Sequence, residues 1–283
     1  MGGPGRRALT TTLMVLGGLG LGAAVWGFGI EPGRLVVHEE RLALPGWPAS
    51  LAGLRLVVLS DLHVGAPHIS LSRLREVVDR TNELAPDLVL ITGDLVITEV
   101  LGGRFVEPEP IAAELGRLRP QLGTYVVLGN HDWYYDGPRI IRALGAAGLG
   151  VLENEAHRIE RPGGAALWVA GVSDEWTSSP RIDRALEPIK DAAPVLLFTH
   201  NPDLFPEVPA RVALTLAGHT HGGQVVLPFV GAMIVPSRYG DRYAAGHVVE
   251  GGRHLYVSSG IGTSIIPVRF GVPPEITLLY LDP

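Results

Sequence analysis

The sequence predicts an α/β (α+β) protein in which β-sheets pack together and helices cover them on the outside. From Leu54 onward, short apolar runs alternate with longer amphipathic runs, a pattern typical of alternating strands and helices. In the last third of the chain the short apolar runs dominate, and Gly and Pro turns separate them. A chain of 283 residues, of which 46% are hydrophobic, is long enough to bury a large core. The sequence contains no internal repeat that would suggest a different architecture.

The predicted strands are short runs rich in Val, Ile, Leu and Thr, too short for buried helices. In chain order they are Leu54–Ser60, Asp87–Thr92, Thr124–Leu128, Leu167–Ala170, Val195–Thr199, Val212–Leu216, His254–Ser258 and Glu275–Leu281. A further edge strand is expected around Arg34–Glu39, ahead of all of these.

Three helices are predicted between the strands. Ser70–Ala85 carries apolar residues at helical spacing, and Ser70 is a suitable N-cap residue. Pro110–Leu118 and Pro138–Ala147 each begin with proline, whose missing N–H costs little in the first turn of a helix.

Charge and cysteine content exclude several classes of protein. The chain has 23 Lys and Arg against 29 Asp and Glu, a net charge of −6, which argues against a nucleic-acid partner. It contains no cysteine, so disulfides, thiolate metal sites and cysteine nucleophiles are excluded. Any metal site must therefore be built without thiolate ligands.

Residues 1–30 are expected to form an N-terminal transmembrane anchor or a signal segment. Ala8 to Ile30 is an uncharged run of 23 residues. As a helix it would be about 34 Å long, enough to cross a hydrocarbon core of ~30 Å. The segment is either a retained anchor or a cleaved signal peptide, which would release a secreted protein. Of the two we expect the anchor, in the cytoplasmic membrane, with the rest of the chain on the outer face.

Five predicted strands run directly into polar residues of the kinds that bind metal ions. The segments are Ser60-Asp61-Leu62-His63, Gly93-Asp94, Gly129-Asn130-His131-Asp132, Thr199-His200-Asn201-Pro202 and Gly218-His219-Thr220-His221. In open α/β sheets, sites assemble from loops at the carboxyl ends of strands, so we expect these side chains to converge.

The candidate metal ligands combine oxygen and imidazole nitrogen without sulfur. They are Asp61, His63, Asp94, Asn130, His200, His219 and His221. This mixture suits Mn, Fe, Zn, Ni or Co better than Ca or Mg, and we expect Mn. Two carboxylates, four imidazoles and an amide are too many for one ion with an open position. We therefore expect two divalent ions about 3.5–4 Å apart.

The motifs DxH, GD, GNH(D/E), H and GHxH, in this order, resemble the signature of the calcineurin-like metallophosphoesterase superfamily. Gly218–Pro228 and Leu255–Glu275 are similar to its small bacterial membrane-linked branch, which has members described as phosphodiesterases. The resemblance implies a four-layer α/β/β/α sandwich of two mixed sheets flanked by helices. It also implies a metallophosphoesterase catalytic domain over residues 53–283, joined to the N-terminal helix by a connecting segment, residues 31–52.

The resemblance assigns roles to individual residues. The first ion would be bound by Asp61, His63 and His221, the second by Asn130, His200 and His219, and both by Asp94. His131 would face the scissile phosphate without binding metal. Asp132 would orient His131 or a ligand, or would only be a turn residue. The chain has Ser259 where that branch has arginine. Arg238 and Arg269 could bind a phosphate or a lipid headgroup through two hydrogen bonds each, but we expect them to be solvated charges.

These observations predict a metal-dependent phosphoric ester hydrolase, and we expect a phosphodiesterase. Its substrate would be a small-molecule or lipid phosphoester, attacked by a metal-bridging hydroxide while His131 protonates the leaving oxygen. One alternative is a lipid-linked nucleotide pyrophosphatase, such as a UDP-diacylglucosamine hydrolase, because the anchor would place the site near lipid. The other is a non-catalytic metal-binding scaffold, which the complete set of motif residues disfavours.

Overall fold

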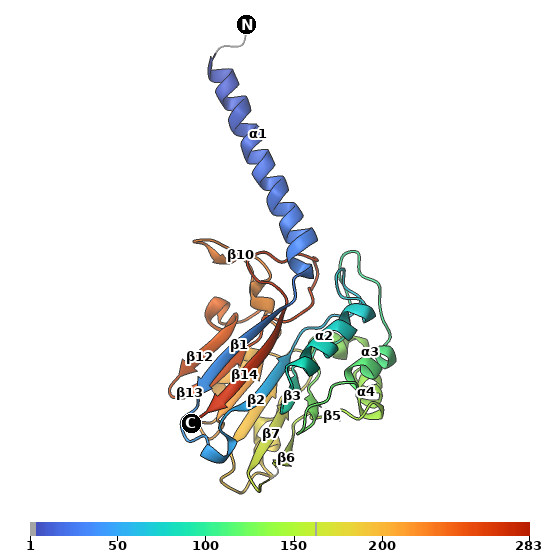
Figure 1. The fold of residues 1–283 in the computed structure, drawn as a ribbon, viewed down its shortest axis with the longest axis vertical. Coiled ribbons are helices and arrows are strands. Elements are labelled where there is room, and N and C mark those ends of the chain that lie inside the picture. Colours follow the sequence, from blue (N-terminus) through green and yellow to red (C-terminus); the bar gives the residue numbers. More distant parts are fainter. Residues whose placement is uncertain (1–3, 162) are drawn as a thin grey trace.

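The computed structural model describes residues 4–161 and 163–283, so the first three residues of the predicted segment 1–30 lie outside the described residues. Two β-sheets face each other, and a single long helix projects from one end of the domain that they form (Figure 1).

Both large sheets have six strands and are mixed. The first has the order β1-β14-β2-β3-β4-β5 and the second the order β12-β13-β9-β8-β7-β6. In these orders, the strands of the first sheet are Val36–Ala43, Glu275–Asp282, Leu54–Leu59, Leu88–Ile91, Thr124–Val126 and Gly150–Val151. Those of the second are Gly246–Glu250, Arg253–Val257, Leu214–Ala217, Val195–Thr199, Ala166–Val172 and Glu155–Glu160. A separate small hairpin consists of β10 (Val226–Leu227) and β11 (Gly231–Ala232).

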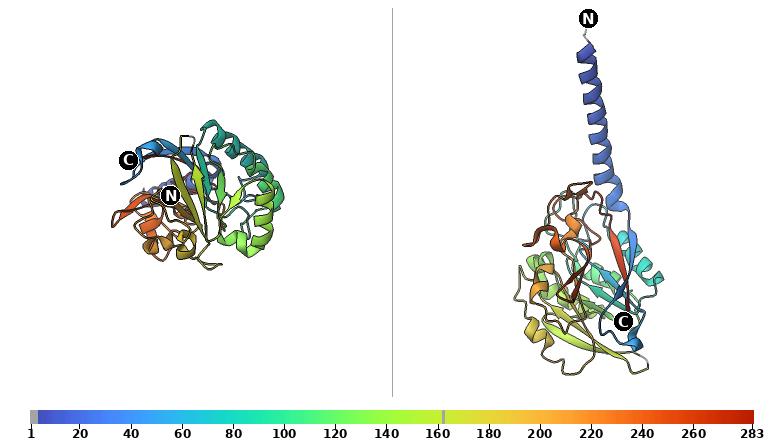
Figure 2. Two further views of the ribbon diagram at one scale, coloured as in Figure 1. Left: turned by 90° about the horizontal axis from the view of Figure 1, so that it is seen from below. Right: turned by 90° about the vertical axis from the view of Figure 1, so that its left-hand side faces the viewer.

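Helices cover the outer face of each sheet, which confirms the predicted four-layer α/β/β/α sandwich (Figure 2). The first sheet carries α2 (Leu71–Glu83), α3 (Pro108–Leu115) and α4 (Asn130–Ala146). The second carries α5 (Ile182–Leu186) and a 3₁₀-helix, Pro202–Glu207. Shorter 3₁₀ turns are Ala49–Leu51, His221–Gly223 and Gly240–Tyr243.

The central strands are buried on both faces. In β2, Leu56 and Val58 pack between the two sheets, whereas Val57 and Leu59 pack under the helices of the first sheet. Side chains that alternate between two buried faces explain why the strand reads as a continuous apolar run. The same double burial holds the ends of β2 and its parallel neighbour β3 in register.

The helix predictions are confirmed with shifted ends. Ser70 caps α2, and its hydroxyl accepts a hydrogen bond from the backbone N–H of Arg73 at 3.2 Å. Helix α4 begins eight residues before the predicted start at Pro138, and its backbone is kinked at Asp136. Pro138 thus begins the second half of α4, while the unpredicted first half carries the polar GNHD residues.

The projecting helix is α1, Pro4–Ala24, which continues through a π-helical segment, Val25–Ile30, and a 3₁₀ turn, Glu31–Gly33. Among the described residues it is the one helix that is long and apolar enough to cross a membrane, with a mean hydropathy of 1.8 over its best window. Its apolar side chains contact little of the domain, and Leu19 is 66% exposed.

Helix α1 joins the domain at a defined edge of the first sheet. After the turn, β1 runs parallel to β14, starting with the pair Val36 and Glu275. Strand β14 is antiparallel to β2, so its beginning lies beside the carboxyl end of β2. Helix α1 and the residues that follow β2 therefore lie at the same end of the domain.

Candidate metal centre

All the predicted site residues follow the carboxyl ends of strands and meet in one region. The loops after β2, β3, β8 and β9 and the first turn of α4, after β4, supply them. The side chains of the seven candidate ligands are buried, and His131 is partly exposed. The parallel pairing of β2, β3 and β4, and of β7, β8 and β9, brings these distant loops together.

Five of the candidate ligands lie on left-handed backbone. The φ angles of Asp61, His63, Asp94, His219 and His221 lie between 42° and 70°. Such conformations cost free energy for residues other than glycine and concentrate at functional sites. The surrounding structure holds these side chains in place at the expense of local backbone strain.

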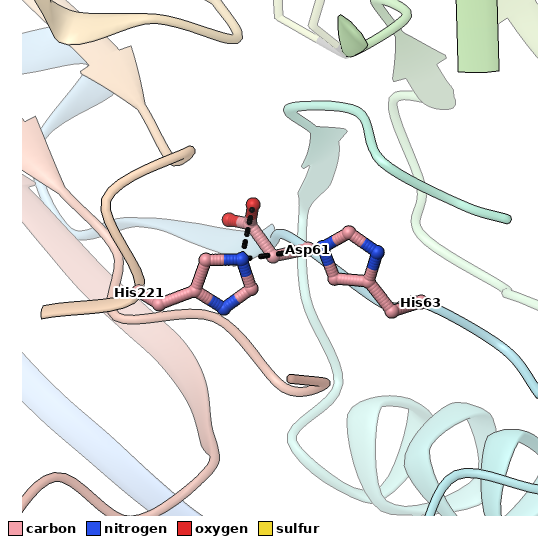
Figure 3. A group of neighbouring side chains, drawn as sticks. All are labelled: Asp61, His63 and His221. Atoms are coloured by element: carbon pink, nitrogen blue, oxygen red, sulfur yellow. Dashed lines mark hydrogen bonds and ion pairs between the residues drawn. The ribbon is translucent and has the colours of Figure 1, made fainter. Parts of the chain in front are cut away.

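One group of ligands comprises Asp61, His63 and His221. Figure 3 shows the ring of His221 facing both the carboxylate of Asp61 and the ring of His63. Nε2 of His221 lies 3.4 Å from Oδ1 of Asp61 and 3.2 Å from Nε2 of His63. The Asp61 carboxylate also accepts hydrogen bonds from the Ser60 hydroxyl and from the backbone N–H of His219. These contacts fix its direction.

A second group comprises Asp94, His200 and His219, with Asn130 beside it. Nε2 of His200 lies 3.1 Å from Nδ1 of His219 and 3.1 Å from Oδ1 of Asn130. Nδ1 of His200 lies 2.7 Å from the carbonyl oxygen of Thr92, to which it donates. A histidine that donates through one nitrogen to a backbone carbonyl presents the other nitrogen to a metal ion, the usual arrangement around bound metals.

Asp94 lies between the two groups. Its Oδ1 accepts a hydrogen bond of 2.9 Å from the backbone N–H of His131. Its Oδ2 lies 3.5 Å from Nε2 of His63 and 3.3 Å from Nε2 of His200. One carboxylate oxygen therefore faces one imidazole from each group.

Burial keeps three of the histidines neutral. It lowers the pKa of His63 and of His219 to about 3, and it lowers the pKa of His221 well below its ordinary value. At neutral pH each of these rings has a lone pair available for a metal ion and no proton to lose first.

Asp94 and His200 are the charged pair of the site. Burial alone would raise the pKa of Asp94, but the charge of His200 overcomes this and lowers it well below its ordinary range. Burial likewise opposes protonation of His200, yet the Asp94 charge raises the pKa of His200 to about 10. Burial also raises the pKa of Asp61 to about 6. The two carboxylates thus lie beside one charged ring, that of His200, and three neutral imidazoles.

This donor set fits divalent cations. Imidazole nitrogens and carboxylate or amide oxygens converge to within 3.1–3.5 Å with too few hydrogens to pair them all. A buried cluster of acceptors that lack hydrogens is costly without a cation. The arrangement therefore suggests a divalent metal-binding site.

His131 lies at the rim of this site. Its Nδ1 is 2.5 Å from the hydroxyl of Thr98, and its Nε2 is 3.5 Å from the hydroxyl of Ser264. Its ring packs edge-on against that of His63, with centroids 4.9 Å apart. His131 also belongs to a third possible ligand group, with His63 and Asp94.

Asp132 connects two loops of the site. Its Oδ1 accepts hydrogen bonds from the backbone N–H groups of Leu95 and Val96, and its Oδ2 accepts one from Gly129. These bonds tie the loop after β3, which carries Asp94, to the first turn of α4. Burial, followed by the Asp94 charge, raises the pKa of Asp132 to about 7.

The expectation that Arg269 is a solvated charge is wrong, because this residue is fully buried. Its guanidinium donates to the carbonyl oxygens of Gly262, Ser259, Gly260 and Val272, and burial lowers its pKa to about 10. Arg269 thus holds together the loop that follows β13 and borders the site. Arg238 is exposed as expected, although Glu175 pairs with it at 2.6 Å.

Residues that the sequence analysis did not single out also border the site. Thr98 and Ser264 contact His131, as described above. Trp176 packs edge-on against His219 at 4.3 Å and is 51% exposed. The only signal in the sequence for Thr98 was its place four residues after Asp94 in the same loop.

Gly218→Ala is expected to disrupt the first ligand group. A Cβ at this position would lie 1.7 Å from the Ser60 hydroxyl and 2.5 Å from Oδ2 of Asp61. The Asp61 carboxylate would have to move, so we expect a lower Tm and weaker metal binding, measured by thermal unfolding with and without Mn²⁺. Gly145→Ala is the control, because a Cβ there meets nothing within 4 Å. Equal Mn²⁺ stabilisation of both variants would contradict this interpretation.

Comparison with known proteins identifies the family of this chain. Residues 54–223 match the family described as Calcineurin-like phosphoesterase. Uncharacterized metallophosphoesterase YkuE of Bacillus subtilis is 30% identical over 275 residues, which cover 94% of each chain. Phosphodiesterase YaeI of Escherichia coli is 32% identical, with 89% of this chain and 90% of that protein covered.

A Danio rerio protein named Transmembrane protein with metallophosphoesterase domain is 33% identical over 89% of this chain. The match covers 58% of that protein, so this chain spans little more than half its length. The names of such relatives and the single apolar helix at the N-terminus suggest membrane association. The converging ligands and the matches over most of its length show that the chain belongs to the calcineurin-like phosphoesterase family and is a metal-dependent phosphoester hydrolase.

Proposed function

We propose that this hydrolase is a dinuclear phosphodiesterase that acts at the cytoplasmic membrane. The observation that carries the proposal is the position of Asp94, whose Oδ2 faces His63 of one ligand group and His200 of the other. A carboxylate shared between two groups of imidazoles is what a pair of closely spaced ions requires.

Two ions account for all the converging ligands. Asp61, His63 and His221 would hold the first, Asn130, His200 and His219 the second, and Asp94 would bind both. The mixture of oxygen and nitrogen ligands favours Mn, with Fe, Zn, Ni or Co as other candidates. When bound, the ions would supply a bridging hydroxide at neutral pH and positive charge for the phosphoryl oxygens.

The chain's own residues complete the proposed mechanism. His131, which is partly exposed at the edge of the metal centre, would face the phosphate and protonate or hydrogen-bond the leaving oxygen. Thr98 would hold the His131 ring through Nδ1, leaving Nε2 for the substrate. We propose Asp132 as a positioning residue, because its backbone hydrogen bonds hold the Asp94 loop against the turn that carries His131.

Residues 1–30 would be a retained anchor, residues 31–52 the connection and residues 53–283 the catalytic domain. The exposed apolar surface of α1 supports the anchor, since such a surface is stable in a hydrocarbon environment. Basic residues balance across the apolar run, with Arg6 and Arg7 before it and Arg34 and Arg41 after it. We base the proposed orientation, with the N-terminus in the cytoplasm and the catalytic domain on the outer face, on the acidic residues Glu31, Glu39 and Glu40 that follow the run.

Hydrolysis of a bis-aryl phosphodiester by the full-length protein tests this proposal. We expect turnover with added Mn²⁺ and its loss with a chelator, and the same assay with Fe, Zn, Ni and Co ranks the metals. Binding of the ions without hydrolysis of any phosphoester in a panel would instead identify a non-catalytic scaffold. The panel includes a lipid-linked nucleotide pyrophosphate, because α1 and the ligand-bearing ends of the strands lie at the same end of the domain.

A further inference from the structure

Exposed apolar side chains gather at the end of the domain from which α1 projects. The turn between β10 and β11 exposes Phe229 fully and Val230 to 68%. Just beyond β11, Met233 is 55% and Ile234 78% exposed. In Figure 1 this hairpin lies at the upper end of the domain, close to the base of α1.

A second exposed apolar segment, Ile265 and Ile266, lies next to the hairpin. These side chains are 69% and 46% exposed. Ile265 also has a φ of 60°, a strained conformation for a β-branched residue. The adjacent Ser264 is bonded to Gln224, which precedes β10, through its backbone N–H and its carbonyl oxygen.

We call these six side chains, Phe229, Val230, Met233, Ile234, Ile265 and Ile266, the apolar rim. Monomeric soluble proteins seldom group so many exposed apolar side chains, which usually mark an interaction surface. Whatever covers the apolar rim must therefore offer an apolar surface of its own.

A chain of direct contacts ties the apolar rim to the base of α1. The backbone N–H of Arg269 donates to the carbonyl oxygen of Gly27 at 3.0 Å, and a Cβ on Gly27 would lie 3.3 Å from Val268. The next residue, Phe270, accepts a hydrogen bond of 2.7 Å from the N–H of Val226 in β10. The consecutive residues Arg269 and Phe270 therefore connect Gly27 to the hairpin.

The base of α1 has the features of a membrane interface. Trp26 is 37% exposed, and the guanidinium of Arg34 lies 5.3 Å from the centre of its ring. Tryptophan concentrates where a spanning helix leaves the hydrocarbon core, and an arginine near the end of such a helix extends its charge toward the headgroups. If α1 spans a bilayer, the segment that touches Gly27 lies at the level of the lipid headgroups, and the hairpin beside it faces the lipid.

We propose that the apolar rim enters the outer surface of the bilayer as a second membrane contact, beside the α1 anchor on which this inference rests. Its side chains would lie about 5–10 Å below the headgroup boundary, the depth of other interfacial apolar surfaces. Two attachments fix the tilt of the domain more firmly than the anchor alone.

This contact would hold the metal centre close to the lipid surface. Ser264, whose hydroxyl lies 3.5 Å from Nε2 of His131, directly precedes the exposed Ile265 and Ile266. The N–H of Leu101, itself 70% exposed, donates to the carbonyl oxygen of Ile265 at 2.9 Å. The loops that border His131 therefore also carry the side chains that would enter the bilayer.

The absence of cysteine allows each position to be labelled separately. Single cysteines are introduced into the full-length chain at Val230→Cys and Ile234→Cys in the rim, Leu19→Cys in α1 and Ala192→Cys. Ala192 is exposed before the start of β8, at the domain end opposite the metal centre. Each variant carries an environment-sensitive fluorophore and is reconstituted into phosphatidylethanolamine–phosphatidylglycerol vesicles that contain spin-labelled lipid.

We expect lipid quenching at positions 19, 230 and 234 and none at 192. Quenching at 19 together with values at 230 and 234 no greater than at 192 would overturn the second contact and leave the anchor intact. An unquenched label at 19 would refute the anchor, and with it this inference. Apolar emission at 230 that lipid does not quench, and that grows with protein density, would show that a second copy of the chain covers the rim.

Discussion

Asp94→Asn is expected to empty at least one metal position. It should lower turnover by more than the ~10–100-fold that is usual when a residue hydrogen-bonded to a metal ligand is replaced. Asp94 offers an oxygen to both ligand groups, so its loss of charge weakens both. The amide has the size of the carboxylate, but it replaces a shared anionic oxygen by a neutral oxygen or an N–H group. Metal analysis of the purified protein and the rise of Tm on adding Mn²⁺ measure the effect.

Asp87→Asn is the matched control for this change. Asp87 is also a buried aspartate of the β3 region, but it lies at the other end of that strand and accepts a hydrogen bond from the backbone N–H of Arg55. We expect Asp87→Asn to affect stability without changing the number of bound ions. Full metal content in Asp94→Asn would show that the negative charge of Asp94 is not needed to hold the ions and would contradict its proposed role.

The convergence of these side chains was predictable because they follow the best-defined strands. Strands β2, β3 and β8 are buried on both faces, so the sequence around them reads as apolar runs that end abruptly in polar residues. Because the carboxyl ends of these strands gather at one edge, apolar patterning alone leads to the expectation that Asp61, Asp94 and His200 meet. The resemblance then supplied the roles of these residues, which spacing alone could not assign.

Other elements could not be predicted, because their sequence patterns are too weak. Strands β6 and β12 lie at the edges of the second sheet and expose much of their length, so they lack an apolar run. Strand β5 has only two residues. Nothing in the residues around Arg269 predicts its burial, because the carbonyl oxygens that it binds come together only when the loop 259–272 folds around the guanidinium. Apolar patterning predicts buried strands and cannot foresee a buried cation.

His131→Ala is expected to leave the bound ions in place and to lower turnover by about 10²–10⁴-fold, the usual contribution of a positioned proton donor. His131 lies at the partly exposed edge of the metal centre. Its Nδ1 is bonded to Thr98, and its Nε2 lies 3.5 Å from the hydroxyl of Ser264. The ion ligands proposed here do not include it, so metal analysis of the variant should match that of the parent protein. His157→Ala removes an exposed histidine from β6 and serves as the control.

The dependence on the leaving group separates the two possible roles of His131. A nitrophenolate departs without a proton, whereas an alkoxide needs one, so loss of a proton donor should slow an alkyl ester far more than a nitrophenyl ester. An equal loss for both esters would mean that His131 only stabilises charge on the phosphoryl oxygens. Loss of ions from His131→Ala would instead make it a ligand of the third group, with His63 and Asp94. Full activity on the alkyl ester would remove His131 from the mechanism altogether, because the imidazole is the only group assigned to the leaving oxygen.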